Sequence, residues 1–292
     1  MVLNIYVNKG KIKRQKRRVN FMERNNNAPV GVFDSGVGGL TVAREITRQL
    51  PRESIVYFGD TARVPYGSKS KDTIIRYSRQ IVRFLQTKDV KAIVVACNTA
   101  SAFALDTIEK ELDIPVIGVV KPGAKSATDN TKNKRIGIIG TEGTIRSALY
   151  TEYIHSIDPE MTVIGKACPL FCPLVEEGML HDSVTYEITR RYLDELKEQN
   201  IDSLILGCTH YPLLRSTIGK VMGEGVKLIN PAYETAISLG EMLKENGISA
   251  DMNAKPKYEF YVSDATEKFK SFANSIMPFE IDETNKINIE EF

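Results

Sequence analysis

Short apolar runs alternate with longer amphipathic segments along this chain, and the alternation predicts parallel strands connected by helices. Strands are predicted at residues 30–33, 54–58, 91–96, 116–120, 135–139, near 163, up to 206, at 226–229 and at 258–262. Helices are predicted at about 40–50, 71–87, 100–112, 145–156, 183–199 and 231–245. Loops are expected at 59–67 and 168–178, and a polar, frayed end at 282–292.

The predicted elements occur twice. An apolar strand, a small polar turn with glycines and a helix follow one another at Asp34 and again at Thr141, which lies 107 positions later. Cysteines follow a buried strand at Cys97 and at Cys208, which are 111 positions apart. This near-constant offset predicts two pseudo-equivalent α/β halves, Rossmann-like or flavodoxin-like, with mostly parallel sheets.

A domain crossing is predicted at residues 121–124, where Lys-Pro-Gly-Ala interrupts the pattern. The first α/β domain is then expected to comprise residues 28–120 plus 230–292, and the second residues 121–229. Residues 1–27 are predicted to be a basic, disordered extension, or to reflect translation from a start upstream of Met22.

Charge changes the picture only at the N-terminus. The formal net charge of +2 includes seven Lys and Arg within residues 1–21; without them, 32 basic residues face 37 acidic ones, about −5. Such a basic arm can contact nucleic acid or anionic lipid. A disordered extension without such a partner is the simpler interpretation of residues 1–27, so neither a nucleic-acid nor a membrane partner is predicted. No apolar run has the roughly 18–20 residues of a membrane helix. Four scattered cysteines favour a reduced, cytoplasmic protein with free thiols.

Two cysteines at strand ends are candidates for acid–base chemistry. A thiol beside a helix N-terminus can have its pKa lowered, because free N–H groups favour the thiolate, which is both base and nucleophile. Two thiols facing one carbon suit removal of a proton on one side and its return on the other, as stereoinversion requires. Taken alone, each of Cys97 and Cys208 is more often a packing residue. Cys168 and Cys172, in a Pro-rich loop, are expected only to pack.

Polar residues beside these cysteines are candidates for holding a substrate. The turn from Asp34 to Gly39 resembles a phosphate-binding loop, but it lacks the full glycine spacing and Asp34 would repel phosphate. The alternative is that Asp34 receives an ammonium group. The loop at 59–67 is a candidate binding loop or a surface connection. The three histidines are scattered, so no metal site is predicted, and no signal for a pyridoxal phosphate cofactor is present.

Together, four stretches resemble the glutamate racemases, cofactor-independent enzymes of the aspartate/glutamate racemase family. The resemblance covers residues from about 28 to beyond 230. The stretches are Asp-Ser-Gly-Val-Gly-Gly at 34–39, Gly-Asp-Thr-Ala-Arg-Val-Pro-Tyr-Gly at 59–67, Ala-Cys-Asn-Thr-Ala at 96–100 and Leu-Gly-Cys-Thr-His-Tyr-Pro at 206–212.

The resemblance implies an active site in a cleft between two domains, with Cys97 and Cys208 as the catalytic pair. Cys97 is expected to act on the D-glutamate face and Cys208 on the L-glutamate face. It further implies Asp34 and His210 as aids to the thiols, with Glu176 as a further one. A homodimer and a role in peptidoglycan synthesis are also implied. The implied substrate-binding residues are Asp34, Ser35, Tyr66, Gly67, Asn98, Thr99, Thr209 and His210.

Two other readings remain open from the sequence. A relative acting on aspartate or another small acid would tend to show Cys-Thr-Glu at the second cysteine, whereas this chain has Cys-Thr-His at 208–210. A Rossmann-like binding module or a dithiol redox protein would use the cysteines for packing or pairing only. Replacing either cysteine by serine would then leave any exchange activity intact.

Overall fold

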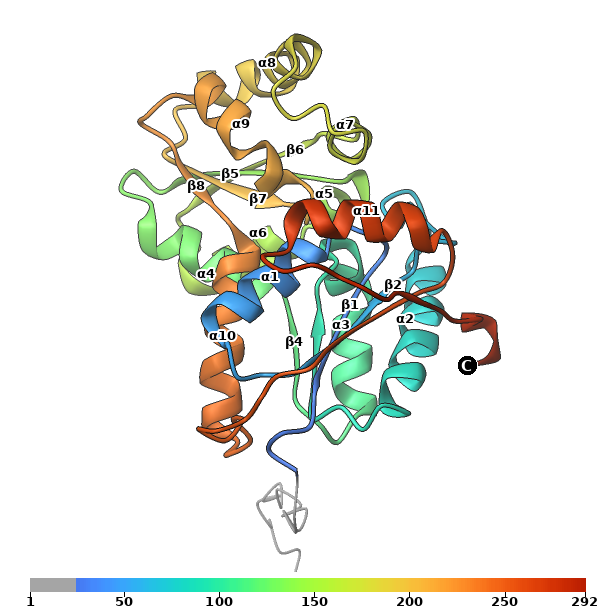
Figure 1. Ribbon diagram of the computed structural model, residues 1–292. Coiled ribbons are helices and arrows are strands. Elements are labelled where there is room, and N and C mark those ends of the chain that lie inside the picture. The colour runs from blue at the N-terminus through green and yellow to red at the C-terminus, as the bar shows by residue number, and fades with distance from the viewer. Residues whose placement is uncertain (1–24) are drawn as a thin grey trace, which may run out of the picture.

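Residues 25–292, which the computed structural model describes, form two sheets flanked by helices, and every described strand pairing is parallel (Figure 1). The first sheet has the order β10-β9-β2-β1-β3-β4 and the second the order β6-β5-β7-β8. The strands are β1 (Val30–Asp34), β2 (Ile55–Gly59), β3 (Ala92–Val95), β4 (Val116–Gly118), β5 (Arg135–Gly140), β6 (Thr162–Ala167), β7 (Ser203–Gly207), β8 (Lys227–Ile229), β9 (Tyr258–Val262) and β10 (Asn285–Lys286).

The predicted repeat is present in the topology. The strand order β2-β1-β3-β4 in the first sheet matches β6-β5-β7-β8 in the second, strand for strand. The fold-class prediction of two pseudo-equivalent parallel α/β halves is therefore confirmed. In such sheets ligands bind beyond the carboxyl ends of the strands at which the order reverses. Those strands are β1 and β3 in the first sheet and β5 and β7 in the second.

Helices cover both faces of each sheet, because buried strands present apolar side chains alternately to opposite faces. In β1, Val30 and Val32 pack with α1, α10 and α11, whereas Phe33 packs on the other face with α2 and α3. The second sheet lies between α7, α8 and α9 on one face and α4 and α6 on the other. The helices are α1 (Leu40–Gln49), α2 (Lys71–Gln86), α3 (Asn98–Glu111), α4 (Val120–Asn130), α5 (Glu142–Arg146), α6 (Leu149–Ile157), α7 (Phe171–Glu176), α8 (Ser183–Glu198), α9 (Arg215–Met222), α10 (Pro231–Glu245) and α11 (Thr266–Ile276), with short 3-10 helices η1 (Tyr211–Leu214) and η2 (Ile289–Glu291).

Three predicted segments have different local structure. Residues 121–124, predicted as a crossing, lie within α4, whose Pro122 is tolerated because it falls in the first turn. The loop predicted at 168–178 contains α7, and the helix predicted at 145–156 is interrupted at Ala148, which has a left-handed φ of 56°. The domain boundaries at residues 121 and 229 stay a prediction.

The structure describes only the last three residues of the extension predicted at 1–27. Residues 1–24 of the predicted extension lie outside the described residues, but Asn27 exchanges hydrogen bonds with Asp251, at 2.7 and 3.0 Å. The last residues of the extension are therefore attached to the fold. Among the helices described, none is long and apolar enough to cross a membrane.

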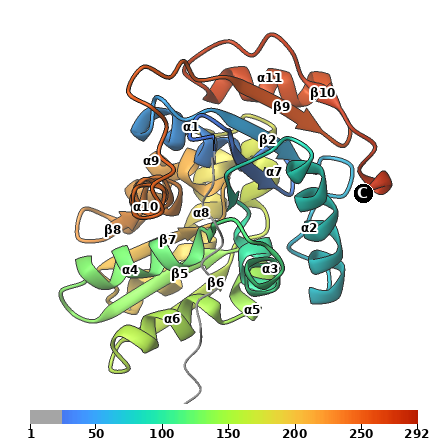
Figure 2. The same cartoon turned by 90° about the horizontal axis from the view of Figure 1, so that it is seen from below.

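The C-terminal segment packs against α2, so the prediction that residues 282–292 fray is wrong (Figure 2). Ile289 is only 3% exposed, and the Phe292 ring meets Phe84 edge-on with centroids 5.5 Å apart. The carboxylate of Glu290 lies 3.0 Å from the Arg63 guanidinium. Tertiary contacts thus order a segment whose local composition is polar.

We expect Ile289→Ala to lower the free energy of unfolding by about 2 kcal/mol, because the truncation leaves a cavity beneath the C-terminal segment. Urea denaturation followed by circular dichroism measures the change. Glu283→Ala, at an exposed position of the same segment, is the matched control and should be near neutral. Equal stability of the two variants would mean that the segment is frayed after all.

Candidate active site

Hydrogen bonds across the two sheets bring four strand ends together. The hydroxyl of Thr209, beyond β7, lies 3.5 Å from Asp34 Oδ1 at the end of β1. Thr99, beyond β3, lies 2.9 Å from the Thr141 hydroxyl beyond β5. Thr41 of α1 also donates to the Thr209 carbonyl at 2.9 Å. The carboxyl ends of the strands at which the order reverses, β1 and β3 in one sheet and β5 and β7 in the other, therefore meet at one site.

Cys97 is the N-cap residue of α3. Its extended backbone (φ −69°, ψ 124°) turns the chain from β3 into the helix, and its Sγ accepts a hydrogen bond from Ala100 N–H at 3.5 Å. The hydroxyl of Ser35 lies 3.6 Å from the same sulfur. The structure thus provides the N–H donor that the sequence predicted.

The predicted lowering of the Cys97 pKa is nevertheless wrong. Burial first, and then the Asp34 carboxylate, raise the pKa of the thiol to about 12, against the opposing hydrogen bonds from Ala100 and Ser35. Charge–charge repulsion with Asp34 makes this thiol sensitive to a cation. An ammonium group beside Asp34 would lower the pKa of Cys97 and favour the thiolate.

Removing the Asp34 charge tests the repulsion between the Asp34 carboxylate and the Cys97 thiolate. We expect Asp34→Asn to lower the pKa of Cys97 and so to increase its alkylation by iodoacetamide at pH 8, because only the thiolate reacts. Peptide-level mass spectrometry over a pH series measures the reaction at Cys97 alone. Asp264→Asn, at an exposed carboxylate, is the matched control. An unchanged pH profile in Asp34→Asn would contradict the assigned repulsion.

Asp34 is a fully buried carboxylate at the centre of the site. Gly36 N–H donates to its Oδ2 at 3.0 Å, and burial raises its pKa despite this bond and the nearby His210 charge. Buried carboxylates are costly unless they are paired with a cation or hydrogen-bonded. Asp34 is thus suited to receive a substrate ammonium group, the role that the sequence predicts for it as an alternative to phosphate binding.

Cys208 begins a row of interacting side chains that ends at the protein surface. Its Sγ lies 3.7 Å from His210 Nδ1, and His210 Nε2 lies 2.9 Å from Glu176 Oε1 on α7. Burial alone would lower the pKa of His210, but hydrogen bonds with Cys208 and Glu176 raise it to about 10. These hydrogen bonds favour the imidazolium form of His210, and the bond between His210 and Glu176 lowers the pKa of the Glu176 carboxylate.

Cys172 lies unexpectedly close to Cys208. The Pro-rich sequence around Cys172 predicts only a packing role, yet α7 places its Sγ 3.5 Å from Cys208 Sγ. The contact with Cys172, followed by burial, raises the pKa of Cys208 well above its usual range, while His210 opposes the shift. No local signal places these two sulfurs together, because the sequence pattern predicts a loop at the segment that carries Cys172.

The remaining predicted residues line the same region. Asn98 accepts a hydrogen bond from Tyr150 at 2.7 Å, which fixes its amide. Thr99 joins a cluster of hydroxyls with Thr141 and Thr144. The sequence does not place Thr141 in the site, although its turn is the predicted repeat of the turn at Asp34.

The binding loop predicted at 59–67 contributes the close-packed backbone of Gly67 and the buried ring of Tyr66. Tyr66 is 2% exposed and donates its hydroxyl to Asp60, so this hydroxyl faces the protein interior. Gly67 lies against the opposite half of the molecule, since an added Cβ would sit 2.8 Å from the Cβ of Thr141. The loop is therefore more than a surface connection.

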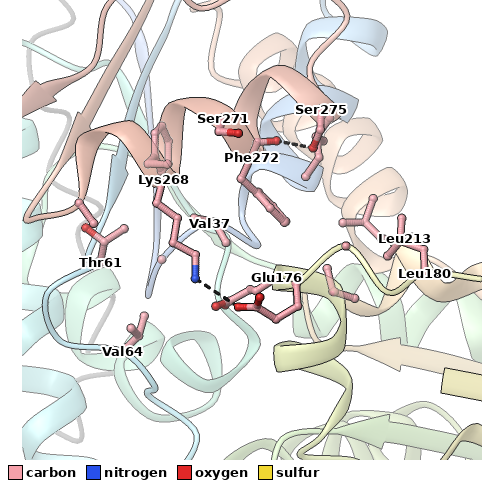
Figure 3. A pocket seen from close by; sticks show the side chains of 17 residues that line it. Val37, Thr61, Val64, Glu176, Leu180, Leu213, Lys268, Ser271, Phe272 and Ser275 are labelled. Atoms are coloured by element: carbon pink, nitrogen blue, oxygen red, sulfur yellow. Dashed lines mark hydrogen bonds and ion pairs between the residues drawn. The ribbon is translucent and has the colours of Figure 1, made fainter. Parts of the chain in front are cut away.

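Two cavities open beside the site. One of about 370 Å³ is lined by Gly67, Thr141, Glu142, Cys172 and Glu176. The other, of about 680 Å³, lies between α7 and α11 (Figure 3). Figure 3 shows Lys268 extending from α11 toward α7, and its ammonium lies 3.6 Å from the Glu177 carboxylate. Glu176 lines both cavities.

Known proteins resemble this chain over most of its length. Residues 30–237 match the model of a family described as Asp/Glu/Hydantoin racemase. A glutamate racemase from Geobacter metallireducens is 47% identical, over 89% of this chain and 97% of that protein.

Solved structures agree with the sequence comparison. A glutamate racemase isoform from Bacillus anthracis superposes with a TM-score of 0.87 at 44% identity, covering 90% of this chain and 98% of its own. A glutamate racemase from Francisella tularensis, solved in complex with D-glutamate, gives a TM-score of 0.85 at 38% identity, covering 91% and 100%.

Proposed function

Because the chain belongs to the Asp/Glu/hydantoin racemase family, we propose that it interconverts L- and D-glutamate without a cofactor, using two cysteines as acid and base. The observation that carries this proposal is the placement of Cys97 and Cys208 beyond the equivalent strands β3 and β7 of the two halves. The product D-glutamate is a precursor of peptidoglycan, so the reaction serves cell-wall synthesis.

The reaction moves one proton off the α-carbon and returns another. With L-glutamate, the Cys208 thiolate takes the α-proton, and the Cys97 thiol delivers its own proton to the opposite face of the carbanion. Cys208 ends as a thiol and Cys97 as a thiolate, which is the state that reacts with D-glutamate. Two similar acids suit a reaction between enantiomers of equal free energy.

The α-proton of an amino acid is weakly acidic, so the developing carbanion must be stabilised. Hydrogen bonds to the α-carboxylate in a closed site supply this stabilisation, because they strengthen as negative charge develops on the carboxylate. We assign them to Asn98, Thr99 and Thr209, which lie beside the two cysteines. Asp34 and Ser35 hold the ammonium group, whose positive charge offsets the repulsion between Asp34 and the Cys97 thiolate.

His210 is assigned to Cys208 as a positioning and charge-balancing residue. An imidazolium 3.7 Å from the sulfur favours the thiolate, and Glu176 keeps the ring charged and oriented. Cys97 instead depends on the Ala100 N–H and on the substrate ammonium. The two thiolates are thus stabilised by different partners.

Incubation of the protein with each glutamate enantiomer in D₂O tests the assignment. We expect the opposite enantiomer to appear with deuterium at the α-carbon in both directions. Aspartate should react at least about 100-fold more slowly, since its shorter side chain misplaces the α-carbon between the thiols. Chiral chromatography and mass spectrometry measure both reactions. Equal turnover of aspartate would overturn the substrate assignment, and absence of exchange would overturn the activity.

The compartment and the assembly state are proposed on the same basis. The four described cysteines are free thiols, which suits a reducing cytoplasm, and the substrate is a small metabolite with no need for nucleic acid or membrane. A homodimer is proposed from the family resemblance. Sedimentation velocity across a concentration series distinguishes it from a monomer.

A further inference from the structure

Three metal-binding side chains converge next to the candidate catalytic site. Sγ of Cys172, Sγ of Cys208 and a ring nitrogen of His210 all lie within 4.8 Å of one another. Cys208 and His210 are buried, whereas Cys172 is partly exposed. The sequence shows no metal motif here, because Cys172 comes from α7 and the other two residues come from the turn after β7.

Two of the three separations between ligand atoms are close to those of a tetrahedral zinc site. With Zn–S bonds of about 2.3 Å and Zn–N bonds of about 2.0 Å, tetrahedral angles require about 3.8 Å between sulfurs and about 3.5 Å between sulfur and nitrogen. The observed distances are 3.5 Å between the two sulfurs and 3.7 Å between Cys208 Sγ and His210 Nδ1. The third separation, between Cys172 Sγ and the ring nitrogen of His210, is at most 4.8 Å, so side-chain movements of up to about 1 Å complete the geometry.

The surroundings of the three ligands also suit zinc. Glu176 holds the far nitrogen of His210 at 2.9 Å, and a carboxylate on the second ring nitrogen is the usual outer partner of a zinc-bound histidine. Cys172 lines the cavity of about 370 Å³, as do the carboxylate-bearing residues Glu142 and Glu176. A divalent cation therefore reaches the Cys172 sulfur from a cavity that carries two acidic side chains.

We propose that Cys172, Cys208 and His210 form an inhibitory zinc-binding site. Binding forms two Zn–S bonds and one Zn–N bond to Nδ1, and releases the protons of both thiols and of Nδ1 to solvent. Nε2 keeps its hydrogen and donates it to Glu176, and a water molecule takes the fourth position. A zinc-bound Cys208 sulfur has its electron pair engaged by the metal, so it no longer accepts the substrate α-proton.

The inhibition rests on the function proposed above, whereas metal binding does not. Equilibrium dialysis of the full chain against buffered Zn²⁺, followed by metal analysis, is expected to give one zinc ion per chain. Co²⁺ in its place should give the thiolate charge-transfer band and the intense visible bands of a tetrahedral site. Glutamate racemisation should fall as zinc binds and recover fully with EDTA.

Cys172→Val removes one ligand while keeping a small apolar side chain at the position. Measured against its own zinc-free racemisation rate, we expect this variant to need at least about 100-fold more zinc for inhibition than the wild type needs, and to lose the cobalt spectrum. Cys168→Ser, outside the cluster, is the matched control and should bind zinc as the wild type does. Glu176→Gln should weaken zinc binding about 10- to 100-fold in dialysis.

Several results would overturn the zinc site. Failure of the wild type to retain zinc or to develop the cobalt spectrum would do so, as would equal binding by Cys172→Val. Inhibition that only a reductant reverses would show a disulfide between Cys172 and Cys208 instead of a metal. If the cobalt spectrum appears but no racemisation is detected in any sample, the proposed function fails while the site stands.

Discussion

Replacing Cys208 by serine is expected to reduce glutamate racemisation about 10²- to 10⁴-fold, the range that a positioned acid–base group contributes. Serine keeps the size of the side chain, but its hydroxyl is far less acidic than a thiol, so the conjugate base does not form at neutral pH. Cys97→Ser should cause a loss of similar size, because each turnover needs both groups.

Deuterium exchange separates the two thiols. In Cys208→Ser the remaining Cys97 should exchange the α-proton of D-glutamate with D₂O without inverting it, and in Cys97→Ser the exchange should be confined to L-glutamate. Cys168→Ser, a buried thiol outside the site, controls for sulfur replacement. Retention of full racemisation in either variant would contradict the two-base mechanism and favour a packing or redox role. Exchange of the same enantiomer in both variants would contradict the assignment of faces.

Gly38→Ala is expected to lower kcat/KM for both enantiomers by at least about 100-fold. An added Cβ would lie 2.3 Å from the Thr209 hydroxyl and 2.5 Å from Nδ1 of His210, so both side chains must move. A displacement of about 1 Å in groups that position a substrate costs about 10²-fold in rate. The backbone at Gly38 does not require a positive φ, so the substitution acts through contact rather than through strain.

A matched glycine distinguishes displacement from general destabilisation. Gly225→Ala has no atom within 4 Å of the added Cβ, and it should leave both activity and stability near the wild-type values. Steady-state kinetics and urea denaturation are measured on both variants. We expect Gly38→Ala to lose stability by about 1–3 kcal/mol while remaining folded. Activity near wild type in Gly38→Ala would mean that Thr209 and His210 do not need their observed positions.

Much of the fold could be predicted because its signals are local. The apolar runs at β1, β3, β5 and β7, each followed by a polar turn, identify buried strands with functional ends. Their repetition identifies the two halves. Predictions from local pattern are wrong where tertiary contacts override it. The Pro-rich segment at 168–178 is predicted to be a loop but contains α7, and the polar C-terminal segment is ordered because Ile289 is buried against α2.

The sequence by itself determined which residues stand at strand ends, since strand periodicity and turn chemistry are properties of neighbouring residues. Only the tertiary structure decided what surrounds them. Cys97 has its expected N–H donor, yet its pKa rises because burial and the Asp34 carboxylate outweigh that donor. Cys208, in the turn after β7, contacts Cys172 on α7, although the two residues are 36 positions apart in the chain. Burial and approach between distant segments are set by packing, so no local pattern records them.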